Sequence, residues 1–451
     1  MKKPISRRGF IRTAAAGSAA LTWIGSGHIP QIFAAESNKP ALLGGSPVHT
    51  GGWPPWPTWR ESWEPAILKV LRSGQWFRGS GQLVPEFETA YAKLIGARRC
   101  LAVASGTTAL MVSLYVLGVD AGDEVIVSPF TFIATYNAVL AHHALPVFAD
   151  TDPATLTIDP ASIEIRITER TRAILPVHIY GMPCEMDAIN AIAKNHRLAV
   201  VEDACQAWLA EYKGRKCGVL GDLGCFSFQN SKHLPAGEGG AITGDSDDLI
   251  DRCNAYHSCG RASGNFKGAR TYFTRGCNYR MQQIQAVMLM QQFDKLIAET
   301  ERRRQNADYL TTQLQKIPGI ITVRLPQNSR PVWHLYPFRY DSQAFNGLGR
   351  DRFIQALNAE GIPCSTGYHE QYFDGLLDEA IASRGFQRLF SASRLKAYRE
   401  SLHELKGNRE VCNTTVAMTQ NLLLAERKDM DHIVEAIFKI KAHSSELAKK
   451  A

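Results

Sequence analysis

The run Leu198-Ala199-Val200-Val201-Glu202, followed at once by Asp203, carries the clearest information about the fold. It is short, almost entirely apolar and preceded by a segment, 186–196, with apolar residues at helical spacing. A short apolar run next to an amphipathic helix is typical of a buried strand in a parallel sheet. The carboxylate of Asp203 then stands at the carboxyl end of that strand.

The same alternation of short apolar runs and amphipathic segments extends outward from this strand. It predicts repeated right-handed strand–helix–strand units, and hence an α/β fold with a mostly parallel central sheet. Ligands of such sheets bind beyond the carboxyl ends of the strands. The further predicted strands are 124–128, 145–149 and 173–177, and the predicted helices are 133–142 and 186–196.

The C-terminal third has a different pattern. A long helix is predicted from Gln285 through Glu301 and beyond, and the mixed pattern from Ile317 to the end predicts a smaller α+β domain. We therefore expect three parts: a leader at 1–35, a large domain with an N-terminal arm at 36–300, and a small C-terminal domain at 301–451.

The first 35 residues have the features of an export signal. Ser6-Arg7-Arg8-Gly9-Phe10 is a twin-arginine pattern, 13–24 is small and apolar, and Ala34-Ala35 offers a cleavage point. The apolar run is too short to span a membrane. The expected location is therefore the periplasm, reached as a folded protein, or the cytoplasm if the leader is only a basic tail.

The net charge of +8 and the distribution of the ten cysteines bear on two questions, a nucleic-acid partner and a disulfide framework. Five of the positive charges lie in the leader, so the remaining chain is not basic enough to indicate a nucleic-acid partner. The cysteines are scattered, several of them in apolar runs, which favours buried free thiols over disulfides. No metal-ligand spacing appears, and no metal is predicted.

Lys232 and Asp203 are the first candidates for chemistry. Lys232 lies in 226–232, where an apolar strand leads into a loop that runs on to the glycine-rich 237–240, and a lysine in a desolvated pocket becomes nucleophilic toward aldehydes. Asp203 could keep a pyridine nitrogen protonated. Taken one at a time, a solvated loop lysine and a turn-capping aspartate explain these residues equally well.

Three further features have the same ambiguity. The turn 105–110 opens an apolar helix, and free N–H groups and hydroxyls there suit a phosphate, although they also suit a plain helix cap. Gln206 could bond a ring hydroxyl or face solvent. Phe132 could stack on a flat ring or belong to the core.

The order and spacing of these features resemble the DegT/DnrJ/EryC1/StrS aminotransferase family over residues 41–440. The similarity includes 176–181, 201–204, 237–240 and 276–281. Within the family, 226–230, 257–261 and 73–76 are most similar to aminohydroxybenzoate synthases and cyclitol aminotransferases. Trp208 departs from the usual pattern, because relatives more often have a small residue or His there.

The resemblance implies a pyridoxal 5'-phosphate (PLP) enzyme with the aspartate-aminotransferase-like fold, fold type I. It implies that Lys232 forms a Schiff base with the cofactor, that Asp203 pairs with the pyridine nitrogen, that Gln206 sits at the ring and that Phe132 stacks on it. It also implies a homodimer, because Asn278 matches a phosphate contact from the partner subunit. The implied phosphate ligands within the chain are Gly106, Thr107, Thr108 and Ser227, and His178 and Tyr368 are expected to contact substrate.

The expected reaction moves an amino group from Glu or Gln to a keto-sugar or keto-cyclitol. Two alternatives stay open. One is a PLP-dependent sugar dehydratase or eliminase, although that branch resembles this chain less because it has His at the position of Lys232. The other is an exported PLP- or sugar-binding protein that no longer turns over.

Overall fold

A seven-stranded sheet forms the centre of the large domain in the computed structural model, which describes residues 38–268 and 271–449. Six strands run in the same direction and β9 runs against both its neighbours. The predicted, mostly parallel sheet is confirmed. In spatial order the strands are β1 (Arg99–Val103), β9 (Gly240–Gly244), β8 (Leu223–Ser227), β5 (Ala199–Asp203), β4 (Thr171–Leu175), β2 (Glu124–Val127) and β3 (Leu145–Phe148).

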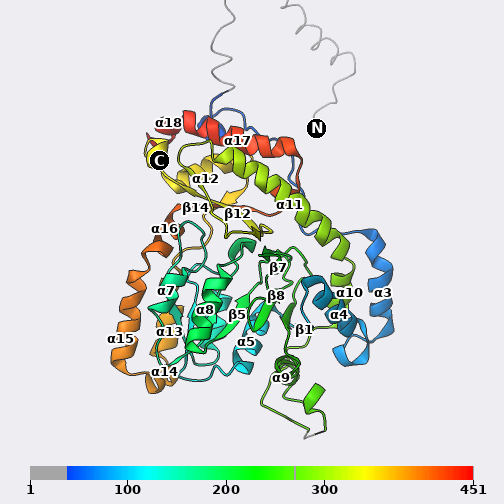
Figure 1. The fold of residues 1–451 in the computed structure, drawn as a ribbon. Helices are drawn as coiled ribbons and strands as arrows, with labels where there is room; N and C mark the ends of the chain where they lie inside the picture. Colours follow the sequence, from blue (N-terminus) through cyan, green and yellow to red (C-terminus); the bar gives the residue numbers. More distant parts are fainter. Residues whose placement is uncertain (1–37, 269–270, 450–451) are drawn as a thin grey trace, which may run out of the picture.

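Helices cover both faces of this sheet (Figure 1). Alternate residues of a strand point to opposite faces: Leu101 of β1 packs in the cluster of α5, whereas Ala102 packs in the cluster of α4. Two-sided burial explains why the strands read as continuous apolar runs. One face carries α5 (Gly106–Val116), α6 (Ala134–Leu140) and α9 (Asp247–His257), and the other carries α4 (Leu83–Ile95), α7 (Pro160–Glu164), α8 (Met186–His196) and α10 (Gln283–Met290).

The predicted long helix is two helices, α10 and α11 (Phe293–Leu314), with a break at Gln291 and Gln292. The Gln292 side chain donates to the carbonyl of Pro235 at 2.8 Å, which holds the break against the loop that follows Lys232. The break contains neither Gly nor Pro, so the sequence alone did not indicate it.

The small domain contains a second, antiparallel sheet, as an α+β domain requires. Its strands, in spatial order, are β10 (Ile320–Thr322), β12 (Leu335–Tyr340), β14 (Thr415–Thr419) and β13 (Cys364–Ser365). The helices around this sheet are α11, α12 (Arg350–Ala359), α16 (Lys406–Thr414), α17 (Arg427–Ala442) and α18 (Ser444–Lys449).

The predicted boundary at 300/301 does not separate two bodies. It falls inside α11, and a later segment returns to the large domain (Figure 1). Leu377, Phe386 and Tyr398 of this segment are buried in the same cluster as Leu145 of the central sheet. The returning helices are α13 (Leu376–Ala382), α14 (Arg384–Leu389) and α15 (Ala392–Ser401).

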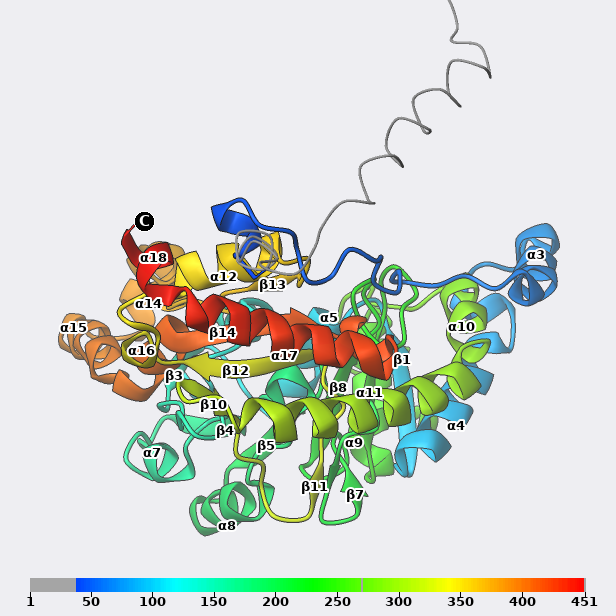
Figure 2. The same ribbon diagram turned by 90° about the horizontal axis from the view of Figure 1, so that it is seen from above.

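The N-terminal arm crosses the small domain before it reaches α3 (Glu64–Ser73), as Figure 2 shows. Trp53 donates its indole N–H to the carbonyl of Gly361 at 2.8 Å, and Asn421 donates to the carbonyl of Pro54 at 2.7 Å. The stretch 53–59, which is rich in Trp and Pro, is therefore tied to the small domain at its start. A small third sheet consists of β6 (Glu211–Tyr212), β7 (Arg215–Lys216) and β11 (Ser329–Arg330).

The predicted leader, 1–35, lies outside the described residues. Within 38–268 and 271–449, no helix is both long and apolar enough to cross a membrane. All ten cysteines are free, and six of them are buried, although Cys259 is exposed. The prediction of buried free thiols holds for most of them.

Candidate active site

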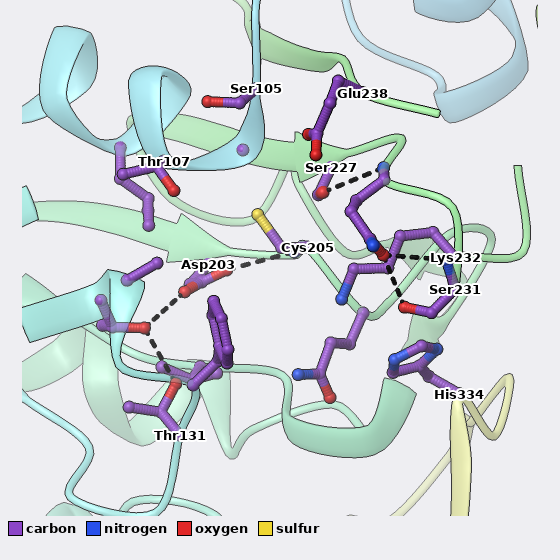
Figure 3. A pocket seen from close by; sticks show the side chains of 18 of the residues that line it. Ser105, Thr107, Thr131, Asp203, Cys205, Ser227, Ser231, Lys232, Glu238 and His334 are labelled. Atoms are coloured by element: carbon purple, nitrogen blue, oxygen red, sulfur yellow. Dashed lines mark hydrogen bonds between the residues drawn. The ribbon is translucent and has the colours of Figure 1, made fainter. Parts of the chain in front are cut away.

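A cavity of about 500 Å³ opens where several strands of the central sheet end (Figure 3). Asp203 is the last residue of β5 and Ser227 is the last residue of β8, so the topology alone brings them to the same edge. The residues that line it include Ser105, Gly106, Thr107, Phe132, Thr135, Asp203, Cys205, Gln206, Ser227, Lys232, Glu238, His334 and Tyr368.

Asp203 is buried and held from two sides. The hydroxyl of Thr135 donates to its Oδ2 at 2.9 Å, and the backbone N–H of Cys205 donates to its Oδ1 at 3.2 Å. Thr131 lies 2.8 Å from the Thr135 hydroxyl and extends this network. The carboxylate is thus fixed in one orientation, with its charge supported by hydrogen bonds.

Lys232 brings its amino group into the same cavity. Burial lowers the pKa of Lys232, whereas the nearby Cys205 and Asp203 act in the opposite direction. The lysine Nζ also lies 5.9 Å from the ring centre of Trp208, whose indole N–H donates to the carbonyl of Ser227 at 3.1 Å. A buried lysine with a lowered pKa has the properties of a carbonyl-directed nucleophile.

The turn before α5 closes one end of the cavity (Figure 3). A Cβ on Gly106 would lie 2.7 Å from the Cβ of Ser227 and 2.8 Å from the sulfur of Cys205, so only glycine fits. Thr107 lines the cavity, but Thr108 does not. The Thr108 N–H and hydroxyl bond to Ser105 in a capping box, so Thr108 supports the turn from behind.

Phe132 and Gln206 bound the cavity on another side. Phe132 is 55% exposed, unusual for a phenylalanine that follows a buried strand, and it lines the cavity. Gln206 accepts from the Tyr180 N–H at 2.8 Å and donates to the Tyr368 hydroxyl at 3.0 Å. Burial raises the pKa of Tyr368 to about 12, so Tyr368 remains a neutral phenol at physiological pH.

His178 does not line the cavity, and the prediction that it contacts substrate is corrected. It is fully buried, with Nε2 2.9 Å from Glu202. The backbone N–H of Cys184 donates to its Nδ1 at 3.1 Å. Both ring nitrogens of His178 therefore have hydrogen-bond partners within the protein, and neither is left to bind a substrate.

Asn278 is also absent from the lining of the cavity within one chain. It pairs through its backbone with Ser258, in the segment that follows α9. The predicted contact of Asn278 with the phosphate bound by a partner subunit therefore stays a prediction.

Some lining residues were missed by sequence reasoning. Thr135 lies inside a predicted helix, where a threonine does not by itself indicate a binding site. His334 comes from the small domain, and only the folded chain brings it to Lys232. Cys205 lies between the predicted site residues Asp203 and Gln206, and Glu238 lies in the glycine-rich loop. Their positions within these motifs could have identified both.

The fold and the site define an enzyme that uses a lysine beside a fixed carboxylate. The model of the DegT/DnrJ/EryC1/StrS aminotransferase family matches residues 58–383. The chain belongs to this family and is an aminotransferase.

Three similar proteins illustrate its relatives. L-glutamine:2-deoxy-scyllo-inosose aminotransferase of Streptoalloteichus tenebrarius is 33% identical over 424 residues, covering 90% of this chain and 98% of that protein. L-glutamine:scyllo-inosose aminotransferase of Streptomyces griseus is 31% identical, with 91% and 99% covered. The crystal structure of 3-amino-5-hydroxybenzoic acid synthase has a TM-score of 0.73 and 27% identity, with 89% and 99% covered.

Proposed function

We propose that this enzyme uses PLP to move an amino group from glutamine or glutamate to a keto-sugar or keto-cyclitol. The observation that carries the proposal is the Lys232 amino group in a cavity that also contains the fixed carboxylate of Asp203. The names of the two relatives, both L-glutamine:scyllo-inosose-type aminotransferases, support the donor and the acceptor class.

The residues present fit PLP. Lys232 would anchor the aldehyde, Asp203 would face the pyridine nitrogen, and Phe132 would lie against the ring. Gly106, Thr107 and Ser227 would receive the phosphate at the start of α5, where the backbone N–H groups and the helix dipole favour an anion. Gly106 keeps this turn close to Ser227 and Cys205, because a Cβ there would force those side chains to move.

PLP, when bound, supplies an aldehyde carbon for amine exchange and a protonated ring that withdraws electrons. The side chains of this chain supply the rest. Asp203, held by Thr135 and Cys205, keeps the ring nitrogen protonated. With the cofactor bound, the Lys232 amino group would lie in the cavity where it can move a proton, and burial lowers its pKa, which favours the neutral, basic form of the amine.

The two alternatives are less well supported. For the dehydratase alternative, the important question is which residue of the Lys232–His233 pair faces the cavity. Lys232 lines it, whereas His233 is buried outside the lining. The binding-protein alternative would use Lys232 and Asp203 only to hold the cofactor, whereas the named relatives are aminotransferases.

The proposal extends to a homodimer with shared sites, in which Asn278 of one chain reaches the phosphate bound by the other. The support is the position of Asn278 outside its own cavity and the frequency of isologous dimers. Light scattering tests the dimer, and PLP titration of Asn278→Ala tests the contact. A monomer that turns over, or unchanged PLP affinity in the variant, would contradict this part.

Export through the twin-arginine route is likewise a proposal, supported only by the sequence of residues 1–35. The test replaces Arg7 and Arg8 with lysines in a host with this pathway and follows cell fractions. Mature variant protein outside the cytoplasm would refute the route, and full-length wild type in the cytoplasm would refute export.

The decisive experiment combines borohydride reduction with donor cycling. We expect a yellow protein whose reduced cofactor maps to the peptide containing Lys232, and whose absorbance shifts when L-glutamine is added and returns with a keto-cyclitol. A label on another lysine would overturn the assignment of Lys232. A correct label without any spectral change on addition of amino donors would favour the binding-protein alternative.

A further inference from the structure

Three metal-binding side chains meet where the N-terminal arm crosses α17. His49 comes from the arm, and Asp429 and His432 lie three residues apart on the first turns of α17. His49 Nε2 is 3.5 Å from Asp429 Oδ1, and His432 Nδ1 is 3.8 Å from the same oxygen. The three candidate ligand atoms all lie within 4.8 Å of one another.

One ring nitrogen of each histidine is buried without a hydrogen-bond partner. His49 is only 6% exposed, and its Nδ1 is buried without a partner. The Nδ1 of His432, which faces Asp429, is also buried without a partner. Buried polar atoms normally have partners, so the unpaired Nδ1 of His432 beside the Asp429 carboxylate calls for an explanation.

The surrounding structure holds the three groups in place. Asp429 Oδ2 accepts from the backbone N–H of Glu426 at 2.9 Å, which directs Oδ1 toward the histidines. The His49 ring stacks on Trp53 with 4.2 Å between ring centres, and the His49 N–H donates to the carbonyl of Glu360 at 2.9 Å. Both the ring and the backbone of His49 are thus positioned by the body of the protein.

We propose that His49 Nε2, Asp429 Oδ1 and His432 Nδ1 form a binding site for a zinc-like divalent cation. Two imidazoles and one carboxylate are a donor set that suits Zn²⁺, with water in the fourth position, whereas Mg²⁺ and Ca²⁺ prefer oxygen ligands. Bonds of about 2.0–2.1 Å place tetrahedral ligand atoms about 3.3 Å apart. Small movements of the two rings would therefore close the site.

Neighbouring positive charges do not oppose this cation directly. Lys428 is paired with Glu426 at 2.9 Å, and Arg302 donates to the carbonyl of Ala425 at 2.9 Å. None of the three ligands lines the cavity that contains Lys232. The metal would therefore fasten the arm to α17 and stabilise the fold, without taking part in amino transfer.

The test uses the purified full chain with its cofactor, treated with a chelator and then titrated with Zn²⁺ by calorimetry. We expect one ion per chain in the wild type, with affinity at least about tenfold weaker in His432→Gln and in Asp429→Asn. Asp429→Asn retains a side-chain oxygen that can cap α17, so it serves if His432→Gln folds poorly. His196→Ala removes a histidine of a surface pair with Glu164 and is the matched control.

Two further measurements separate this site from the free thiols and from the cofactor. Co²⁺ should give a spectrum without thiolate-to-metal charge transfer, because the proposed ligands contain no sulfur. The thermal midpoint should rise with Zn²⁺ in the wild type and in His196→Ala, but not in His432→Gln. No saturable Zn²⁺ binding to the wild type, a thiolate signature, or equal binding by both variants would overturn the proposal.

Discussion

Substitution of Glu202 tests how hydrogen bonds hold β5, the strand that ends at Asp203, in place. Glu202 is fully buried next to Asp203 in β5, on the opposite face of the strand. Its Oε1 accepts from the N–H groups of Leu220 at 2.6 Å and Gly221 at 2.7 Å. Its Oε2 accepts from the N–H of Gly218 at 2.7 Å and from His178 at 2.9 Å.

Glu202→Gln keeps the shape of this side chain but replaces one acceptor oxygen with an NH₂ group. Two of the four donors then lose their acceptor and face another donor. An unsatisfied buried group costs about 1–3 kcal/mol, so the free energy of unfolding should fall by about 2–6 kcal/mol. Because no cavity is created, this loss reports the hydrogen bonds alone.

Urea unfolding of the apoprotein measures the effect as a lower midpoint at an unchanged slope. Glu211→Gln is the control, because Glu211 is partly exposed and its ion pair with Arg330, at 3.7 Å, should contribute at most about 1 kcal/mol. A loss below about 1 kcal/mol for Glu202→Gln would refute the idea that this carboxylate anchors the segment 218–221.

Three further predictions concern the cavity. Asp203→Asn should lower the rate of donor-dependent absorbance change about 10²-fold, because an amide cannot hold the charge of the ring nitrogen; an unchanged single-turnover rate would contradict this. Gly106→Ala should reduce stability by about 1–3 kcal/mol, through the 2.7 Å approach to Ser227, and weaken PLP binding in a titration. Lys232→Met should stabilise the apoprotein at pH 8. The pKa of Lys232 is lower in the folded state than its ordinary value of 10.5. Between these two pKa values the unfolded chain binds more protons than the folded chain, so the lysine destabilises the folded state below pH 10.5. The gain should shrink as urea midpoints are measured toward pH 10.5, and a gain independent of pH would exclude this cause.

The sequence was sufficient to predict β2, β3, β4 and β5 of the central sheet and the edge at which the site lies, but not the antiparallel β9. The apolar run that ends at Asp203 marks a buried parallel strand, and parallel strands end at one edge. Lys232, Gln206 and Phe132 follow such ends, and all of them line the cavity.

The rest depended on information that local patterns do not contain. His178 lies in a motif beside the cavity, but its bonds to Glu202 and to the backbone of Cys184 hold it within the protein. His334 reaches the cavity only through the packing of the small domain. The break at Gln292 depends on a contact with Pro235, and an amphipathic pattern does not say that α13–α15 pack on the central sheet.

The return of α13–α15 to the central sheet has a consequence for synthesis on the ribosome. A nascent chain that has reached residue 300 contains every strand of the central sheet but lacks Leu377, Phe386 and Tyr398, which complete its core. The apolar surface that these residues cover stays open to water until translation has passed about residue 400. The large domain therefore finishes folding only near the end of translation, and a fragment that stops at residue 300 should bind chaperones and aggregate.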